Sequence, residues 1–212
     1  SSYTLKGNIP HYVSESNTQP GMPKYKDLNG DGIIDTNDRT MIGRGLPIHT
    51  GGFTNNFEYK GFDLSVFFQW SYGNDVLNAN RLFFDSGFQK KRELNQYASY
   101  TNRWTPENPN SDIPAATNSS SNLVISSRVV EDASFLRLKT VTLGYTVPKT
   151  FLKKYKIDNA RLYVAAQNLW TITGYSGYDP EVSIRSGGLT PGLDFSSYPR
   201  ALSVSFGINL GF

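Results

Sequence analysis

The chain has 212 residues, of which 38% are hydrophobic and 14% aromatic, with 13 Tyr, 13 Phe and 19 Gly, a composition that favours strands and turns over helices. The formal net charge of +3 comes from scattered basic residues, with short runs only at residues 90–92 and 153–154, which excludes an extended nucleic-acid-binding surface. The absence of Cys excludes a disulfide framework and thiolate metal sites.

Residues 1–26 are polar and rich in Pro and Gly, which predicts a loop or a weak strand. Residues 27–38 then match the spacing of a calcium-binding loop, with side-chain oxygens at positions 1, 3 and 5 and a turn at Gly32. The predicted ligands of a structural Ca²⁺ are Asp27, Asn29, Asp31, Ile33, Asp35 and Asp38. Position 12 holds Asp where EF-hands carry Glu, as in dockerin-type loops, which shortens the reach of this ligand. The alternative is a metal-free surface loop built on Asx-turns.

Residues 52–72 predict an antiparallel hairpin with a tight turn at Lys60-Gly61. Its second strand, residues 62–72, alternates strictly between apolar and more polar positions over eleven residues. A strand that crosses a membrane needs about 9–11 residues. No apolar run in the chain approaches the roughly 18 residues of a membrane helix. The pattern therefore indicates crossing strands rather than crossing helices.

Residues 73–133 show no clear alternation and predict a long loop. Loops of this length are rare in compact soluble domains but normal on the extracellular side of a barrel. Flat aromatic side chains in the loop are candidates to contact a ligand, namely Tyr97, Tyr100 and Trp104. Packing of the loop on itself is the alternative interpretation of these residues.

Residues 134–212 predict the last three strands, at 134–147, 159–173 and 198–212. The alternation of the first of these slips by one position, and a bulge near Lys139 would explain the slip. The last strand alternates between large apolar residues and small polar ones. We therefore expect its apolar face to meet lipid and its polar face to line a lumen.

The order of strands and loops also predicts an orientation. If the C-terminus is periplasmic, the short connections at residues 60–61 and 148–158 lie on the periplasmic side. The longer connections, including 27–38, 73–133 and 174–197, then lie outside the cell. Short inner turns and long outer loops are the rule in bacterial barrels.

The final eight residues, 205–212, end in an aromatic residue preceded by alternating hydrophobic residues and Gly. This pattern resembles the assembly signal that the barrel-insertion machinery reads in outer-membrane proteins, with Ser205, Gly207, Leu210 and Phe212 as its residues here. The alternative is the edge strand of a soluble sandwich, which would be an aggregation hazard if left unprotected.

Signals for catalysis are poor. His11 and His49 are isolated, and residues 174–177 miss the G-x-S-x-G nucleophile elbow by one position. Asp179 and Glu181 flank a Pro, with no second carboxylate pair to oppose them. We therefore expect neither an enzyme nor an organic cofactor.

Several stretches of the chain share a family pattern, namely Pro20–Asp35 with Asp38–Gly43, Tyr59–Ser65, Gly73–Val76, Val130–Lys139, Leu143–Pro148, Arg161–Val164, Gln167–Leu169 and Tyr175–Glu181. In these stretches the chain resembles the SusC/RagA family. The resemblance covers roughly residues 20–212 in order, and the first 20 residues match less well.

This resemblance implies an all-β fold, in which antiparallel strands form the C-terminal part of a large outer-membrane barrel of about 22 strands with a plugged lumen. It also implies a TonB-dependent transporter of Bacteroidota-type bacteria that imports oligosaccharides, or peptides, together with a SusD-like surface lipoprotein. The plug domain, the earlier strands and the segment that contacts TonB would belong to parts of the protein outside these 212 residues. The alternative is a soluble, β-rich, calcium-binding adhesion or carbohydrate-binding module.

Overall fold

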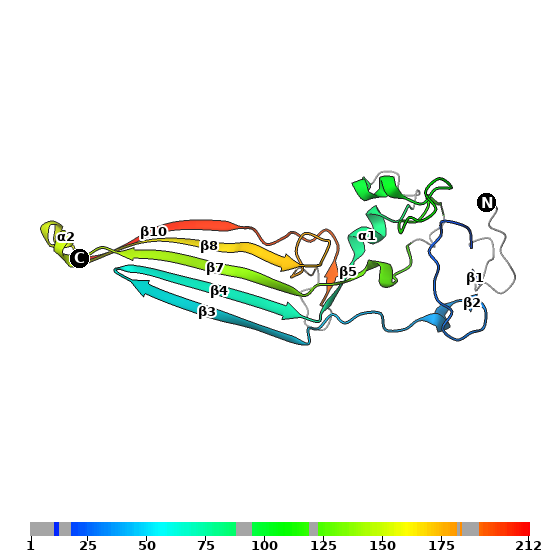
Figure 1. Ribbon diagram of the computed structural model, residues 1–212, viewed down its shortest axis with the longest axis horizontal. Coiled ribbons are helices and arrows are strands. Elements are labelled where there is room, and N and C mark those ends of the chain that lie inside the picture. The colour runs from blue at the N-terminus through cyan, green and yellow to red at the C-terminus, as the bar shows by residue number, and fades with distance from the viewer. Residues whose placement is uncertain (1–10, 13–17, 88–94, 119–122, 182, 184–190) are drawn as a thin grey trace. The chain divides into compact units, whose positions relative to one another are not determined.

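The computed structural model describes residues 11–12, 18–87, 95–118, 123–181, 183 and 191–212 (Figure 1). The chain divides into two compact units, each of which is described by itself. The sheet unit comprises Arg44–Val76, Glu131–Gly192 and Ser197–Phe212, and the loop unit comprises Ser1–Gly43, Leu77–Val130 and Leu193–Ser196. The basic run at residues 90–92 lies outside the described residues.

The sheet unit is built on one antiparallel five-stranded sheet with the strand order β10-β8-β7-β4-β3 (Figure 1). Its strands are β3 (His49–Tyr59), β4 (Phe62–Tyr72), β7 (Phe135–Thr146), β8 (Asn159–Thr173) and β10 (Ser203–Gly211). Each corresponds to a strand that the sequence predicts. The last strand begins at Ser203 rather than at residue 198, because Pro199 has no N–H and the N–H of Arg200 donates to Asp179.

The β3–β4 connection is a two-residue turn made of Lys60 and Gly61, whose φ angles are 48° and 87°. Positive φ at both central residues is the mark of a type I′ turn, whose twist matches that of the flanking strands. Gly61 also has no room for a side chain, because a Cβ there would lie 2.9 Å from the carbonyl oxygen of Thr146. The predicted tight hairpin is confirmed.

The two faces of the sheet differ in polarity along every strand. Residues paired directly across neighbouring strands share a face. One row across all five strands on the apolar face consists of Phe57, Leu64, Leu143, Val164 and Phe206. The adjacent row on the opposite face consists of Asn56, Ser65, Thr142, Ala165 and Ser205. The alternation predicted for the chain is therefore continuous over the whole sheet.

Strand β7 contains a bulge at Lys139. On the β4 side, Phe67 and Phe68 pair with Thr140 and Leu138, so Lys139 has no partner. The ladder to β8 is interrupted at the same point. The extra residue moves the two halves of β7 into one phase, so that its leucines lie on the same side as its valine and tyrosine. The bulge expected near Lys139 is confirmed, and it explains the slip in the alternation.

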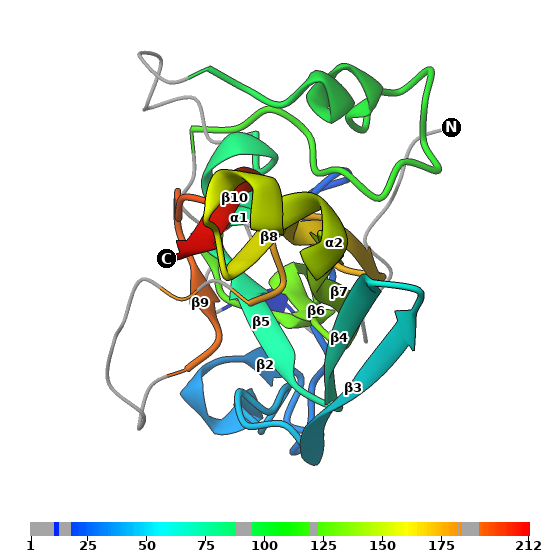
Figure 2. The same cartoon turned by 90° about the vertical axis from the view of Figure 1, so that its left-hand side faces the viewer.

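Both short connections lie at one end of the sheet. The β7–β8 connection contains α2 (Lys149–Leu152) and the 3-10 helix η6 (Lys153–Tyr155). The N–H of Asp158 donates to the carbonyl oxygen of Gly211 at 2.8 Å, so the end of β10 lies beside this connection. In Figure 1, α2, the C-terminus and the β3–β4 turn all lie at the left-hand end of the sheet, and Figure 2 looks at the molecule from this end. The two longer connections leave the sheet at its other end.

At that other end, a small core of Val76, Ala133 and Tyr175 is buried. The strand β6 (Val130–Asp132) leads into this core, and the N–H of Ala133 donates to the carbonyl oxygen of Asn74 at 2.8 Å. The N–H of Gly73 donates to the Ser134 hydroxyl at 2.9 Å. These bonds fix the points at which the long segment leaves β4 and returns to β7.

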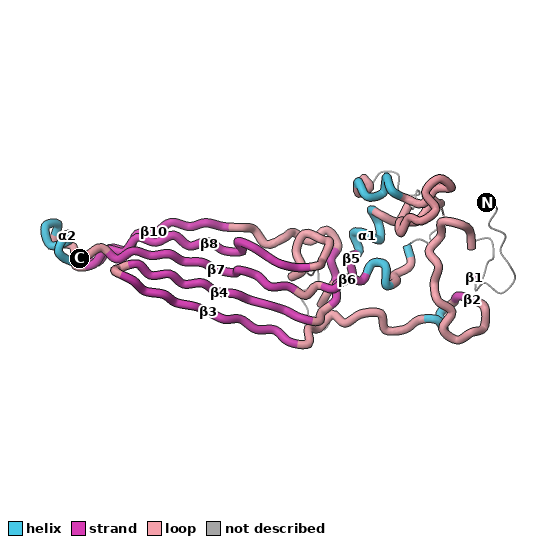
Figure 3. Tube along the Cα trace, viewed as in Figure 1, coloured by secondary structure: helices cyan, strands magenta, loops and turns pink. Residues whose placement is uncertain are grey.

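The loop unit consists of short elements, drawn mostly as loop in Figure 3. They are β1 (His11–Tyr12), β2 (Ile33–Ile34), β9 (Leu193–Asp194), α1 (Ala79–Phe84) and the 3-10 helices η2 (Thr36–Asp38), η3 (Ala98–Asn102) and η5 (Ser127–Val129). The strand β5 (Asp75–Asn78) pairs with β9 in parallel at Leu77 and Leu193. Residues 73–133 thus hold more local structure than the predicted loop. In the part of the chain described here, no helix is long and apolar enough to span a membrane.

Candidate functional site: a two-faced wall and its loop-end side chains

The apolar face of the sheet is uncovered. Phe206 is 82% exposed, Ile208 63% and Phe57 59%, and none of the described segments packs over them. Soluble monomers rarely leave a continuous apolar surface of this extent exposed. The arrangement suits a wall with a low-dielectric medium on one side.

The opposite face carries polar groups held in place across strands. The Arg161 guanidinium on β8 donates from Nε to Asp63 Oδ1 on β4 at 3.0 Å, passing over Gly144 of β7. The ring of Tyr163 lies over Gly207 of β10, where a Cβ would collide with it. Glycines beneath large side chains allow this face to carry an ion pair and a tyrosine without distorting the sheet.

A buried ion network lies on the polar face, at the end of the sheet from which the two longer connections leave. Arg137 of β7 is 2% exposed and donates from Nη1 to Glu181 at 3.0 Å and from Nη2 to Asp179. Lys139 and Arg200 also reach Glu181, at 3.3 Å and 2.9 Å. The network joins two strand residues to a segment more than 40 residues away in the sequence.

Burial alone would raise the pKa of Asp179. Hydrogen bonds from Arg137 and from the N–H groups of Glu181 and Arg200 outweigh burial, so the pKa of Asp179 lies below its ordinary value. The carboxylate is therefore ionised at neutral pH and holds its segment against the sheet.

The segment from residue 174 to 181 is fixed at two further points. Tyr175 is buried in the small core, and the N–H and hydroxyl of Ser176 both donate to Glu131 at 2.9 Å. Between these points and the ion network, Tyr178 is 82% exposed. The sequence patterns did not predict the ion network that holds this segment against the sheet. The available signal was a pair of basic residues, Arg137 and Lys139, in an otherwise apolar and neutral strand.

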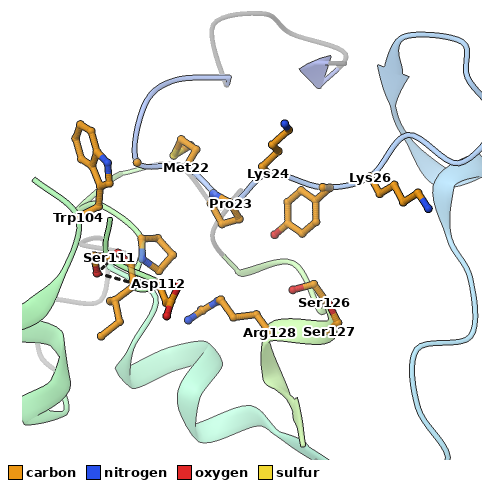
Figure 4. Close-up of a pocket in the computed structure, with 14 residues that line it drawn as sticks. Met22, Pro23, Lys24, Lys26, Trp104, Ser111, Asp112, Ser126, Ser127 and Arg128 are labelled. Atoms are coloured by element: carbon orange, nitrogen blue, oxygen red, sulfur yellow. Dashed lines mark hydrogen bonds between the residues drawn. The ribbon is translucent and has the colours of Figure 1, made fainter. Parts of the chain in front are cut away.

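A pocket of about 500 Å³ lies within the loop unit (Figure 4). Its lining includes Tyr25, Trp104, Asp112 and Arg128, and in Figure 4 the Arg128 side chain points toward Asp112. Arg128 donates from Nη1 to the carbonyl oxygen of Asp85 at 3.4 Å, whereas its buried Nη2 has no hydrogen-bond partner among the residues that the structure describes. Burial lowers the pKa of Arg128 from its ordinary value and raises that of Tyr25. A buried guanidinium with unused donors is a group that an acceptor on a ligand would satisfy.

The three aromatic residues proposed for ligand contact do not gather in one place. Trp104 lines the pocket. Tyr97 packs edge-on against Phe84, with 5.5 Å between ring centroids, and Tyr100 lies under the Arg103 guanidinium at 5.3 Å. Neither tyrosine is among the residues that line the pocket. The geometry therefore favours Trp104 over the other two.

The predicted calcium loop is closed by its own carboxylates. Asp27 accepts from the N–H groups of Gly30 and Gly32 at 2.6 and 2.9 Å, and Asp38 accepts from Leu28 and Asp35 at 2.7 and 2.9 Å. These backbone bonds lower the pKa of Asp38 from its ordinary value.

Among the described residues, no three His, Asp or Glu side chains are arranged to hold a metal. Each ionised carboxylate nevertheless has about four lone-pair sites, so the backbone bonds leave capacity for a cation. The donors are the hard oxygens that Ca²⁺ prefers. The calcium site stays a prediction.

The residues of the predicted assembly signal divide between the two faces. Ser205 and Gly207 lie on the polar face of β10, whereas Leu210 lies on the apolar face and is 52% exposed. Phe212 follows the strand and is 84% exposed. Recognition of these residues by an insertion machinery stays a prediction.

Comparison with known proteins identifies relatives along almost the whole chain. No protein-family model matches it. The chain is 38% identical to TonB-dependent receptor P3 of Formosa agariphila, over 97% of this chain and 21% of the receptor. It is 29% identical to TonB-dependent receptor SusC of Bacteroides thetaiotaomicron, over 94% of this chain and 18% of that protein. The chain thus spans about a fifth of the length of these curated relatives.

Solved structures give the same result. The RagAB peptide importer in its closed-closed state matches with a TM-score of 0.73 and 29% identity, over 90% of this chain and 21% of that one. The open-open state of the same importer matches with a TM-score of 0.68 and 32% identity, over 79% and 17%. In sequence and in fold, the chain belongs to the SusC/RagA family of TonB-dependent receptors and carries part of their antiparallel barrel sheet.

Proposed function

We propose that this chain forms part of the wall of an outer-membrane, TonB-dependent transporter that imports an oligosaccharide or a peptide. The observation that carries the proposal is the uncovered apolar face, backed by a polar face, over five strands of 9 to 15 residues. Strands of this length cross a bilayer when tilted. The apolar face then meets lipid, and the polar face lines the lumen.

The remaining parts of the transporter are proposed from the family resemblance. The rest of the barrel and the plug domain complete the lumen, and TonB acts on the part of the protein that holds the plug. A SusD-like surface lipoprotein captures the substrate outside the cell. The similarity to the RagAB peptide importer supports a peptide as the substrate. The similarity to SusC is compatible with an oligosaccharide, the substrate class that we expect first.

We further propose that the pocket in the loop unit contacts this substrate. Trp104 offers a flat ring, and Arg128 offers a buried donor that no group in the described part of the chain accepts. Aromatic rings pack against sugar rings and against peptide side chains alike, while a guanidinium binds carboxylates and other acceptors in a fixed geometry. Tyr97 and Tyr100 would act indirectly, by shaping the loop.

The first experiment is peptide mapping of the native protein in the outer-membrane fraction, extracted in mild detergent. We expect these 212 residues within a longer membrane protein that co-purifies with a lipoprotein. A free species of 23.7 kDa in the soluble fraction would instead favour the calcium-binding adhesion or carbohydrate-binding module.

Substrate class is tested by growth. Cells lacking the gene are grown on oligosaccharides or on peptides as the limiting nutrient, and complemented with Trp104→Ala or with Trp170→Ala. Trp170 is a matched control because it lies on the apolar face, opposite Leu138. We expect Trp104→Ala to slow growth on one nutrient class, with normal amounts of protein in the membrane. Equal growth of both variants would remove the pocket from the substrate path.

A further inference from the structure

The connection between β7 and β8 is compact and strongly basic. Residues 148–158 contain four lysines, at positions 149, 153, 154 and 156, and a single acidic residue, Asp158. Leu152 is buried and anchors the connection, and Lys156 takes a left-handed conformation with φ of 57° that ends η6. Around this anchor, Phe151 is 70% exposed and Tyr155 68%. The turn is therefore an ordered structure that presents cations and aromatic rings to its surroundings.

The charges of these lysines are unmatched. All four are exposed, and no ion pair involves them in the described part of the chain. The basic residues of the polar face behave differently, because Arg137, Lys139 and Arg161 each contact a carboxylate. The sheet unit thus pairs these three cations of its polar face with carboxylates, whereas the lysines of this turn have no ion-pair partner among the described residues.

The position of the turn relates it to the apolar face. At this end of the sheet, aromatic residues lie on the apolar face of β3, β4 and β7, and Phe62 of β4 lies against Tyr145 of β7 with 4.6 Å between ring centroids. Next to them, the Lys60 ammonium lies 5.1 Å from the centre of the Tyr59 ring. Aromatic rings of this kind sit at the level of lipid head groups. The lysines of the turn begin four residues after Tyr145 and so lie at or just beyond that level.

We propose that the β7–β8 turn is a binding site for acidic phospholipid head groups. The lysine ammonium groups would contact the lipid phosphates, and Phe151 and Tyr155 would lie among the head groups. Lysines attract an anionic lipid surface additively, and their long apolar stems let them reach it from a bilayer edge. The inference rests on the proposed outer-membrane placement of the sheet, and it adds a lipid preference at one end of the barrel.

The test uses the full-length transporter, purified in mild detergent and mixed with equal amounts of phosphatidylglycerol and phosphatidylethanolamine. Native mass spectrometry counts the lipids that stay bound. We expect the wild type to retain phosphatidylglycerol preferentially. Lys153→Gln with Lys154→Gln should cut that retention several-fold without changing the retention of phosphatidylethanolamine, whereas Lys153→Arg with Lys154→Arg should preserve it.

The matched control is Lys24→Gln with Lys26→Gln, which removes the same charge from two exposed lysines of the loop unit. Equal losses in both glutamine variants, or no preference in the wild type, would overturn the inference. Folding is checked in each sample by the mobility shift of unheated barrels in detergent gels. A protein that forms no such barrel would contradict the proposed function instead, so the two failures are distinguishable.

Discussion

Arg161 and Asp63 lie on strands that flank β7 on either side, and their side chains meet above Gly144. The guanidinium donates from Nε to the Asp63 carboxylate at 3.0 Å and also from Nη2. Both side chains are about a third exposed, at 28% and 32%. The pair thus links three neighbouring strands on the polar face, and it can do so only because the middle strand has no side chain at the crossing point.

We predict that Gly144→Ala destabilises the folded protein by up to about 1 kcal/mol, the contribution of a part-exposed ion pair, because the ends of the Arg161 and Asp63 side chains must move apart. The added Cβ would collide with Asp63 and with Arg161. Urea titration followed by gel mobility of unheated protein measures the change. In a background carrying Asp63→Ala and Arg161→Ala, the same substitution should cost less. An equal cost in both backgrounds would show that the pair is not the source of the crowding.

The assignment of the faces predicts unequal effects of the same substitution in β10. Val204→Arg places a charge on the apolar face, next to Ala166 and away from the row of Phe62 and Tyr145, and should cost about 2–4 kcal/mol near the bilayer centre. Ser205→Arg places it on the polar face, where water is available, and should cost much less. Folding into lipid vesicles at increasing urea concentrations compares the two variants. Equal costs would mean that the assigned strand phase is wrong.

Removing Arg137 should release the segment at residues 174–181. Arg137→Ala leaves Asp179 and Glu181 without their buried partner, and breaking such a network costs about 3–5 kcal/mol. Limited proteolysis should then cut within the segment in the variant and not in the wild type. Adding Asp179→Asn and Glu181→Gln should restore part of the resistance, because the uncompensated charges are gone. Resistance of Arg137→Ala itself would mean that Tyr175 and Ser176 suffice to hold the segment.

The Asp179 carboxylate predicts that the stability of the folded protein depends on pH. Because the pKa of Asp179 is lower in the folded protein, its contribution is present above the unfolded value of about 3.9 and is lost as pH falls through the folded value. The thermal midpoint should therefore fall below about pH 4. Asp179→Asn should flatten this part of the profile, whereas Asp112→Asn, at an exposed position, should leave it as in the wild type. A wild-type profile for Asp179→Asn would contradict the assignment.

If the loop at residues 27–38 binds Ca²⁺, adding the ion to chelator-treated protein should raise the thermal midpoint, because a ligand that binds only the folded state stabilises it. Asp31→Asn is the informative variant. The N–H of Ile33 donates to the Asp31 carboxylate at 2.8 Å. The amide oxygen of the variant can still accept this bond, although the negative charge is gone. We expect a smaller calcium-induced shift in this variant than in Asp112→Asn. The same shift in both variants would leave the loop as a metal-free set of Asx-turns.

Local patterns were sufficient for the strands and insufficient for the contacts between distant segments. Strict alternation in β4 and β10 predicts both strands and their faces, because the pleat fixes the direction of each side chain. The start of β3 at His49 was missed because Gly51 and Gly52 interrupt the alternation, and the aromatic rings of Trp70 and Phe67 on β4 take the place of their side chains.

The network around Arg137 could not be predicted from spacing. Its partners lie 42 and 44 residues away, so only the fold brings them together. The aromatic residues assigned to ligand contact show the same limit. Composition marks Tyr97, Tyr100 and Trp104 as equal candidates, and only tertiary packing places Trp104 alone on the pocket wall.

The bulge at Lys139 has a consequence for how β7 tolerates change in length. In the sequence, the apolar residues of the two halves of β7 alternate out of phase with each other, and the unpaired Lys139 between them brings both sets to one face. Deleting Lys139 would make Leu138 and Thr140 neighbours, so both halves of β7 could keep their faces and their partners on β4 without a bulge. A one-residue insertion beside Lys139 would instead enlarge the bulge or move one half of β7 along β4 by two positions. The strand should therefore tolerate the loss of a residue at this point better than the gain of one.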